Sequence, residues 1–286
     1  MKNRKILTGL AVLVGLIGVL FLSLPTILHK SGLHPEYAGP LIDLPGKRAL
    51  IVTTSHGVLS APGETEGDVT GLLSSEMTHP YYAFLDGGME VDLASIQGGE
   101  IPMDPTSFFY MIKSPEDERY LNDAVAQAKV KNSIPIAEVD IDQYDIVFIS
   151  GGFGAAYDLA QSPALADKVS EAYYGDKRAI IAGVCHGALG LVSARDTDGN
   201  LLIKGRRMTG VSDKQIKELG VYSITPKHPE TELRKAGALY ESQTAFRDFF
   251  AAHMTVDEER RFVTGQNQNS GLEMAHTIMK ILRERE

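Results

Sequence analysis

The chain has 286 residues, in which 28 lysines and arginines stand against 37 aspartates and glutamates, for a formal net charge of −9 with histidine neutral. This acidic balance argues against a nucleic-acid-binding protein, which normally presents a basic surface. A hydrophobic content of 43% and a charged content of 23% are typical of a folded globular chain. The single cysteine, Cys185, excludes an intramolecular disulfide and a multi-cysteine zinc site.

An apolar segment begins the chain. No residue from 6 to 28 is charged, and Leu, Val and Ile dominate this run. As a helix rising about 1.5 Å per residue, the run is about 35 Å long, enough to span the roughly 30 Å of the hydrocarbon core of a bilayer. Lys2, Arg4 and Lys5 precede it, so the positive-inside rule places the N-terminus in the cytoplasm and the rest of the chain outside. We therefore expect residues 1–30 to be a cytoplasmic N-terminus and transmembrane anchor of a single-pass cell-membrane protein.

A cleaved signal peptide is the alternative to a retained anchor. It shares the basic start, but its apolar core is about 7 to 15 residues long and is followed by a small-residue cleavage site. The run here is longer and no A-x-A pattern follows it, which favours the anchor. In residues 31–48, recurring glycine and proline interrupt both helical and strand periodicity, which predicts a linker.

The remaining chain alternates predicted strands and helices. Short, apolar, β-branched runs predict strands at residues 49–54, 89–95, 144–150 and 178–184, and helical patterns occur at residues 115–129, 162–173 and 268–283. This alternation implies an α/β domain over residues 49–286, with a mainly parallel sheet covered by helices on both faces. In such sheets, the chemistry gathers at the carboxyl ends of the strands.

The strand at residues 178–184 runs directly into Cys185 and His186. The pentapeptide from Gly183 to Gly187 is the cysteine version of the nucleophile elbow G-x-S-x-G, and it lies in the expected strand, turn and helix context. The turn is too tight for Cβ atoms beside the nucleophile, and a helix N-terminus behind the sulfur favours the thiolate. A buried structural cysteine in a glycine-rich turn is the alternative.

Two other segments carry candidate site residues. Gly151 and Gly152 follow the strand at residues 144–150, and backbone N–H groups there, with the amide of His186, could form an oxyanion hole. Glu76 follows the first strand and its loop, where a carboxyl group could hydrogen-bond Cys185 and set its ionisation. The alternatives are an ordinary strand-to-helix turn for the glycines and a helix-start or surface acid for Glu76. The histidines show no paired metal-ligand spacing, so we expect no metal.

Together, Glu76, the GGFGAAYDL segment and the AGVCHGALGL segment resemble the ThiJ/PfpI family of the class I glutamine amidotransferase-like superfamily. The similarity extends from about residue 49 to the C-terminus and is greatest to the branch of heat-shock chaperones and glutathione-independent glyoxalases. It implies a flavodoxin-like α/β fold. It also implies that Cys185 is the nucleophile, His186 its proton-transfer partner and Glu76 the acid that hydrogen-bonds the sulfur, with Gly152 and His186 supplying the oxyanion amides.

The sequence departs from this family's pattern at two positions. Phe153 stands where the family often has histidine, and Ile216 occupies the position nearest to the acid that orients the catalytic histidine. Asp213 and Glu218 flank Ile216, and either is a candidate orienting acid.

A second triad within the superfamily is suggested by His228-Pro229-Glu230, which resembles the H-P-E of true glutamine amidotransferases. In those enzymes the motif lies near the chain end, whereas here it suits the first turn of a helix.

The resemblance implies a thiolate enzyme that converts a 2-oxoaldehyde into a 2-hydroxy acid without glutathione or any redox cofactor. One alternative is a stress chaperone or redox-sensing protein in which Cys185 is an oxidation sensor. A further alternative is an amidase, peptidase or glutamine amidotransferase-like hydrolase, because a thiol and an oxyanion hole also suit acyl transfer. The expected partners are a small carbonyl substrate and the membrane, with no nucleic acid. Related folds often dimerise, so a homodimer is among the expected assemblies of this chain.

Overall fold

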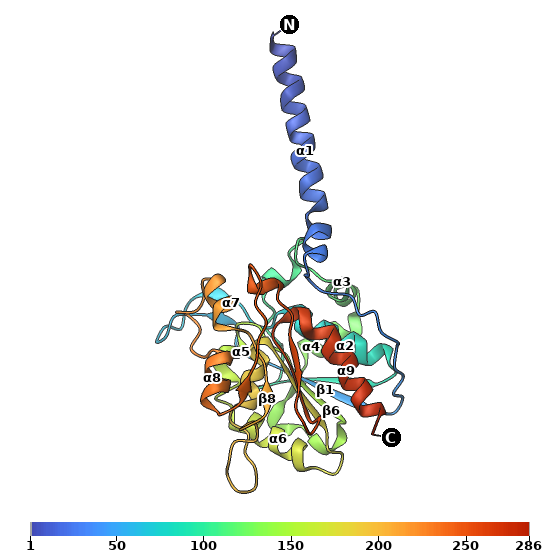
Figure 1. The fold of residues 1–286 in the computed structure, drawn as a ribbon, viewed down its shortest axis with the longest axis vertical. Helices are drawn as coiled ribbons and strands as arrows, with labels where there is room; N and C mark the ends of the chain where they lie inside the picture. Colours follow the sequence, from blue (N-terminus) through green and yellow to red (C-terminus); the bar gives the residue numbers. More distant parts are fainter. Residues whose placement is uncertain (1, 286) are drawn as a thin grey trace.

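A computed structural model describes residues 2–285, which form one long helix standing on an α/β domain (Figure 1). The helix, α1, covers Lys2–Lys30. Its segment Thr8–Lys30 is long and apolar enough to cross a membrane, and its most apolar part is not buried in the domain. A signal sequence would meet the same two criteria.

Within the described residues, seven strands form the central sheet in the order β10-β11-β7-β6-β1-β4-β5. The strands are β1 (Arg48–Thr53), β4 (Glu90–Ser95), β5 (Ile134–Pro135), β6 (Ile146–Ile149), β7 (Ile180–Val184), β10 (Met254–Val256) and β11 (Phe262–Gly265). All neighbouring pairs are parallel except β10 and β11, so the prediction of a mainly parallel sheet is confirmed. Val52 pairs with Ile149, and Ile149 pairs with Gly183, which brings the carboxyl ends of β1, β6 and β7 to one edge. Two small sheets, β2 (Val58–Leu59) with β3 (Asp68–Val69) and β8 (Arg207–Met208) with β9 (Leu239–Tyr240), lie outside it.

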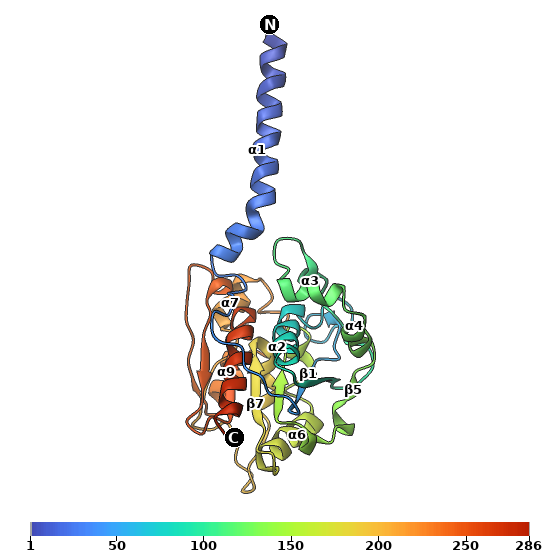
Figure 2. The same ribbon diagram turned by 90° about the vertical axis from the view of Figure 1, so that its right-hand side faces the viewer.

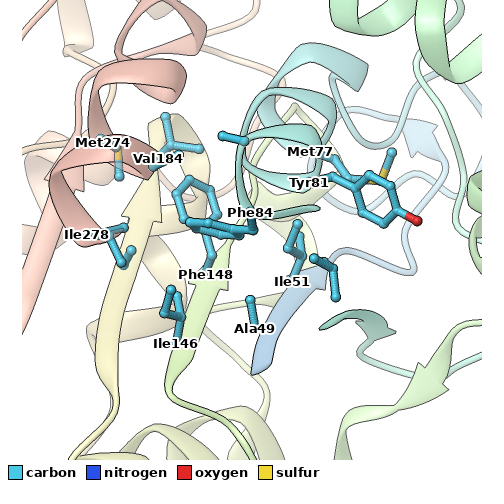
Figure 3. Close-up of a cluster of buried hydrophobic side chains, with 14 of the residues drawn as sticks. Ala49, Ile51, Met77, Tyr81, Phe84, Ile146, Phe148, Val184, Met274 and Ile278 are labelled. Atoms are coloured by element: carbon cyan, nitrogen blue, oxygen red, sulfur yellow. The ribbon is translucent and has the colours of Figure 1, made fainter. Parts of the chain in front are cut away.

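Helices cover both faces of the central sheet (Figure 2). On one face, α2 (Ser74–Asp86) and α9 (Gly271–Arg283) pack over the side chains of β1, β6 and β7 shown in Figure 3. On the other face lie α5 (Ala155–Asp158), α6 (Pro163–Tyr174) and α8 (Pro229–Lys235). Successive side chains of β1 alternate between these layers, Ile51 toward the first and Leu50 toward the second. Burial on both faces explains why this strand reads as a continuous apolar run.

The prediction of one helix over residues 115–129 is wrong, because the structure has two helices, α3 (Pro115–Leu121) and α4 (Ala124–Lys131). Ser114 caps α3, as its sequence indicates, through a capping box with Asp117. The break arises at Asp123, whose carboxylate accepts hydrogen bonds from the Val125 and Ala126 amides and so begins a second helix.

Residues 31–48 lie against the domain. Leu33 and Leu44 are buried in it, and the amide of His34 donates a hydrogen bond to Oδ1 of Asn269 at 2.9 Å. This segment has neither helix nor strand from residue 31 to residue 47, as glycine and proline predict, yet its apolar side chains fix its path.

Candidate active site

Cys185 follows the last residue of β7 at the carboxyl edge of the sheet. Its φ angle is +56°, a left-handed conformation that is uncommon and strained for a residue with a Cβ atom. Glycine is required two residues later, because a Cβ on Gly187 would lie 2.1 Å from the Ile149 carbonyl oxygen of β6. The chain continues as a 3₁₀-helix, Cys185–Leu191, where the sequence predicts a helical segment. The elbow therefore holds Cys185 in a tight turn between two strand ends.

Glu76 lies in the first turn of α2 and is completely buried. Its Oε2 accepts a hydrogen bond from the Gly151 amide at 3.0 Å, and its backbone carbonyl accepts one from the Ser150 hydroxyl at 2.9 Å. Burial raises the pKa of Glu76 to about 8, while hydrogen bonds with the Cys185 thiol and the Gly151 amide limit the rise. The carboxyl group is therefore largely protonated at neutral pH and can act as a donor to the sulfur.

Burial also raises the pKa of the Cys185 thiol well above its usual value, and the charge and hydrogen bond of Glu76 raise it further. The amides of His186 and Gly152 hydrogen-bond the sulfur and act in the opposite direction. The expectation that a helix N-terminus favours the thiolate at this sulfur stays a prediction: burial opposes ionisation of the thiol, and the two amides favour it. Two negative charges so close together cannot both form, so the thiolate requires a protonated Glu76.

His186 presents a neutral imidazole to the sulfur. Its Nδ1 lies 3.6 Å from Sγ of Cys185, and burial, with a smaller effect from His228, lowers the pKa of the ring to about 3. The Phe153 ring approaches it edge-on, with 5.8 Å between ring centroids. A neutral ring with a free lone pair beside a thiol can accept the thiol proton.

The two candidate orienting acids have their hydrogen bonds elsewhere. Oδ2 of Asp213 accepts from the Thr231 hydroxyl at 2.9 Å, and Oε2 of Glu218 accepts from the Asp248 amide at 2.9 Å. Among the described residues, Nε2 of His186 and Oδ1 of Asp213 are both buried without a hydrogen-bond partner. The structure thus brings together Cys185, His186, Glu76 and the Gly152 amide, while Glu218 and one carboxylate oxygen of Asp213 bond to other residues.

Sequence reasoning named Gly151 and His228 as candidates but missed the contacts that they make at this site. The amide of Gly151 holds Glu76, and a Cβ on Gly151 would lie 2.7 Å from Oε2 of Glu76 and 2.8 Å from the His186 nitrogen. The paired glycines after the strand are the signal for this close approach. His228 precedes α8 as its N-cap residue, so the H-P-E segment begins a helix, as predicted. Its effect on the pKa of His186 nevertheless places it near the elbow, which its spacing in the sequence does not reveal.

Among residues 2–285, no group of three or more His, Cys, Asp and Glu side chains is arranged to hold a metal ion. The polar groups that surround the sulfur are the His186 imidazole, the Glu76 carboxyl group and the amides of Gly152 and His186.

A cysteine elbow at the carboxyl edge of a mainly parallel sheet, with a buried carboxyl group and an imidazole beside its sulfur, defines an α/β protein with a cysteine-based candidate active site. Residues 70–281 match the DJ-1/PfpI family, and the chain belongs to this family. The resemblance to the ThiJ/PfpI family identified from the sequence is thereby confirmed.

Relatives of the chain include Glyoxalase 3 of Candida albicans, 29% identical over 222 residues that cover 75% of this chain and 91% of the relative. The glutathione-independent glyoxalase HSP31 of Saccharomyces cerevisiae is 30% identical over 236 residues, covering 78% and 93%. The solved structure of Rapid Encystment Protein 24 kDa from Francisella tularensis has 32% identity and a TM-score of 0.74, covering 82% of this chain and 99% of that one. Glyoxalase III of Candida albicans has 26% identity and a TM-score of 0.72, covering 82% and 97%.

Proposed function

We propose that the chain is a membrane-anchored, glutathione-independent glyoxalase that converts a 2-oxoaldehyde such as methylglyoxal into a 2-hydroxy acid, with Cys185 as its nucleophile. The observation that carries the proposal is the contact of Sγ of Cys185 with the neutral imidazole of His186, at 3.6 Å, beside the protonated carboxyl of Glu76. The glyoxalase names of relatives that match this chain over most of its length support the same reaction.

In the first step, the sulfur of Cys185 attacks the aldehyde carbon and forms a C–S bond, while Nδ1 of His186 accepts the thiol proton. The carbonyl oxygen becomes an oxyanion, which the amides of Gly152 and His186 stabilise, since both already face the sulfur. Return of a proton to this oxygen gives a hemithioacetal. Glu76 stays protonated and donates its hydrogen bond to the sulfur, so no second negative charge opposes the attack.

In the second step, His186 removes the proton from the former aldehyde carbon and delivers it to the adjacent ketone carbon through an enediol. The aldehyde carbon is oxidised to a thioester and the ketone carbon is reduced to an alcohol, so electrons balance within the substrate. Water then hydrolyses the thioester, releasing the 2-hydroxy acid and restoring the thiol. The sequence needs neither glutathione nor a redox cofactor.

The arrangement around the membrane is part of the proposal. We assign residues 1–30 to the anchor, residues 31–48 to the linker and residues 49–286 to the catalytic domain, placed outside the cytoplasm by the basic N-terminal flank. Extraction of cell membranes with alkaline carbonate tests this point. An anchored chain stays with the pellet, whereas a chain processed as a secreted protein is released and lacks its N-terminus.

The site disfavours the redox-sensor alternative. Sensor cysteines are exposed and have a lowered pKa, whereas Cys185 is 6% exposed and its thiol has a raised pKa. A buried, protonated thiol that a neighbouring base deprotonates during attack suits a catalyst better.

The test measures methylglyoxal consumption and lactate formation by the purified full chain in detergent, without glutathione. We expect Cys185→Ala to reduce both rates to background. Ser193→Ala is the matched control, because it removes one side-chain hydroxyl whose hydrogen bond goes to the Ala160 carbonyl, away from the sulfur. Equal rates for the wild type and Cys185→Ala would refute the proposed chemistry.

A further inference from the structure

Two loops with exposed aromatic side chains flank the domain-side end of α1. In residues 108–113, Phe109 is 59% exposed and Tyr110 is 49% exposed. In residues 245–250, Phe246 is 97% exposed. Among the described residues beyond α1, the one other aromatic side chain that is mostly exposed is Tyr174. Exposed aromatic surface is therefore concentrated around the base of the apolar helix.

Contacts hold the first loop against α1. The ring of Tyr110 stacks on Phe21, with 5.8 Å between centroids and 18° between planes, and its hydroxyl donates to the Leu22 carbonyl at 3.5 Å. The Ile112 carbonyl lies 2.7 Å from Nε2 of His34, and His34 is four residues after Lys30, where α1 ends. Figure 2 shows this loop, before α3, rising beside the lower part of α1.

The second loop lies on the same end of the domain. The Phe249 carbonyl accepts a hydrogen bond from Nδ2 of Asn269 at 2.8 Å, and Oδ1 of the same asparagine accepts from the His34 amide. A Cβ on Gly32, just after α1, would lie 3.4 Å from the Phe250 carbonyl. Both loops are thus fixed to the chain segment where α1 ends.

The length of the apolar run decides where these loops lie relative to a bilayer. Residues 6–20, which precede the contact with Tyr110, would span only about 22 Å as a helix, which is less than the roughly 30 Å of a hydrocarbon core. The charge-free run continues to Leu28 and reaches about 35 Å in full. A bilayer of ordinary thickness therefore includes helix beyond Phe21, and the loop that contacts Phe21 must lie at the depth of the outer interface.

We propose that the loops at residues 108–113 and 245–250 insert their aromatic side chains into the interfacial layer of the outer leaflet. The domain is then seated on the phospholipid surface and not suspended from it by a free tether. Aromatic side chains are enriched at this layer, and Phe109 and Phe246 supply exposed apolar area. The inference rests on the proposed anchoring by α1.

The absence of tryptophan from the chain makes a direct test possible, because one introduced tryptophan reports one position. Phe109→Trp and Phe246→Trp report the two loops. Leu16→Trp reports the middle of α1, and Tyr174→Trp reports α6, which lies at the end of the domain away from α1 (Figure 1). Each full-length variant is reconstituted in phosphatidylcholine vesicles with or without spin-labelled lipid, and tryptophan emission is recorded; the spin label is at the glycerol end of the acyl chains for the domain positions and near their methyl end for Leu16→Trp.

We expect blue-shifted emission and strong quenching by the spin label for Phe109→Trp and Phe246→Trp, and neither effect for Tyr174→Trp. If Leu16→Trp is quenched and the tryptophans at positions 109 and 246 are not, the inference is overturned and the anchor remains. The same result is expected if these loops bind a protein and not the membrane. Absence of quenching in Leu16→Trp as well rejects both the anchor and the seated domain. Methylglyoxal turnover by the same variants reports separately on the proposed chemistry.

Discussion

The buried carboxyl of Glu76 makes folding stability depend on pH in a defined direction. Burial raises its pKa from 4.5 to about 8 in the folded chain. Because the folded pKa lies above the unfolded one, the native state holds one more proton between these pH values. The contribution of the protonated carboxyl to the free energy of unfolding is fully present below pH 4.5, and it is lost as the pH rises through 8. At about 1.4 kcal/mol per pKa unit, the full shift corresponds to about 5 kcal/mol.

Between pH 6.5 and 8, comparison of the wild type with a variant that lacks the Glu76 carboxyl separates this effect from the other strongly shifted groups. Burial lowers the pKa of His34 and His79 to about 4 and that of His186 to about 3, so protonation of these rings in the unfolded chain fades just above their ordinary pKa of 6.5 and acts equally in both proteins. The Cys185 thiol, whose pKa is raised, affects stability only above pH 9. Within the interval, we expect the wild type to lose about 2 kcal/mol of unfolding free energy through Glu76.

Glu76→Gln removes the titrating group while its amide oxygen can still accept the hydrogen bond from Gly151. Glu64→Gln, at an exposed loop position, is the matched control for the loss of one acidic group. Guanidinium unfolding of the full chain in detergent micelles, followed by circular dichroism, gives the free energy at each pH. The wild type and Glu64→Gln should weaken together from pH 6.5 to 8, and Glu76→Gln should lack their common decline. A decline of the same size in Glu76→Gln would refute the raised pKa and the burial argument behind it.

Three further outcomes follow from single contacts. Gly151→Ala should reduce turnover and destabilise the fold by about 1–3 kcal/mol, because the added Cβ would lie 2.8 Å from the backbone nitrogen of His186. Gly18→Ala is the control, since a Cβ at Gly18 has open space around it, and it should change neither turnover nor stability. Leu44→Ala should cost about 2–5 kcal/mol in guanidinium unfolding and Leu41→Ala less than about 0.5 kcal/mol, since Leu44 is 2% exposed and Leu41 is 79% exposed; equal costs would contradict the docked linker. In D₂O, the lactate formed should carry deuterium at its second carbon, since His186 exchanges its proton with solvent between the two carbons; complete retention of the substrate proton would contradict this route.

Much of the fold could be predicted from the sequence because β1 and β7 are buried on both faces and therefore read as unbroken apolar runs. The edge of the sheet could not be predicted in the same way. β10 and β11 are short, and β11 carries threonine and glycine, so their pairing depends on neighbours that only the folded chain provides. The division of α3 from α4 depends on the side chain of Asp123, which the helical pattern around it conceals.

At the site, the residue types could be predicted and their ionisation could not. The elbow motif identifies Cys185 and His186, because a strand, a tight turn and a helical segment have a characteristic spacing. The raised pKa of Glu76 depends on its complete burial in the first turn of α2, which no local pattern encodes. The hydrogen bonds of Asp213 and Glu218 likewise depend on partners distant in sequence. The catalytic roles of these residues stay predictions.

The central claim is that the sulfur of Cys185 bonds covalently to the substrate during turnover. The most direct measurement is mass spectrometry of peptides from protein quenched in acid during turnover of methylglyoxal. The account predicts a mass increase of one substrate molecule on the peptide that contains Cys185, lost on prolonged turnover and absent from Cys185→Ala. Lactate formation by the wild type with no adduct on this peptide, at a rate that Cys185→Ala retains, would contradict it.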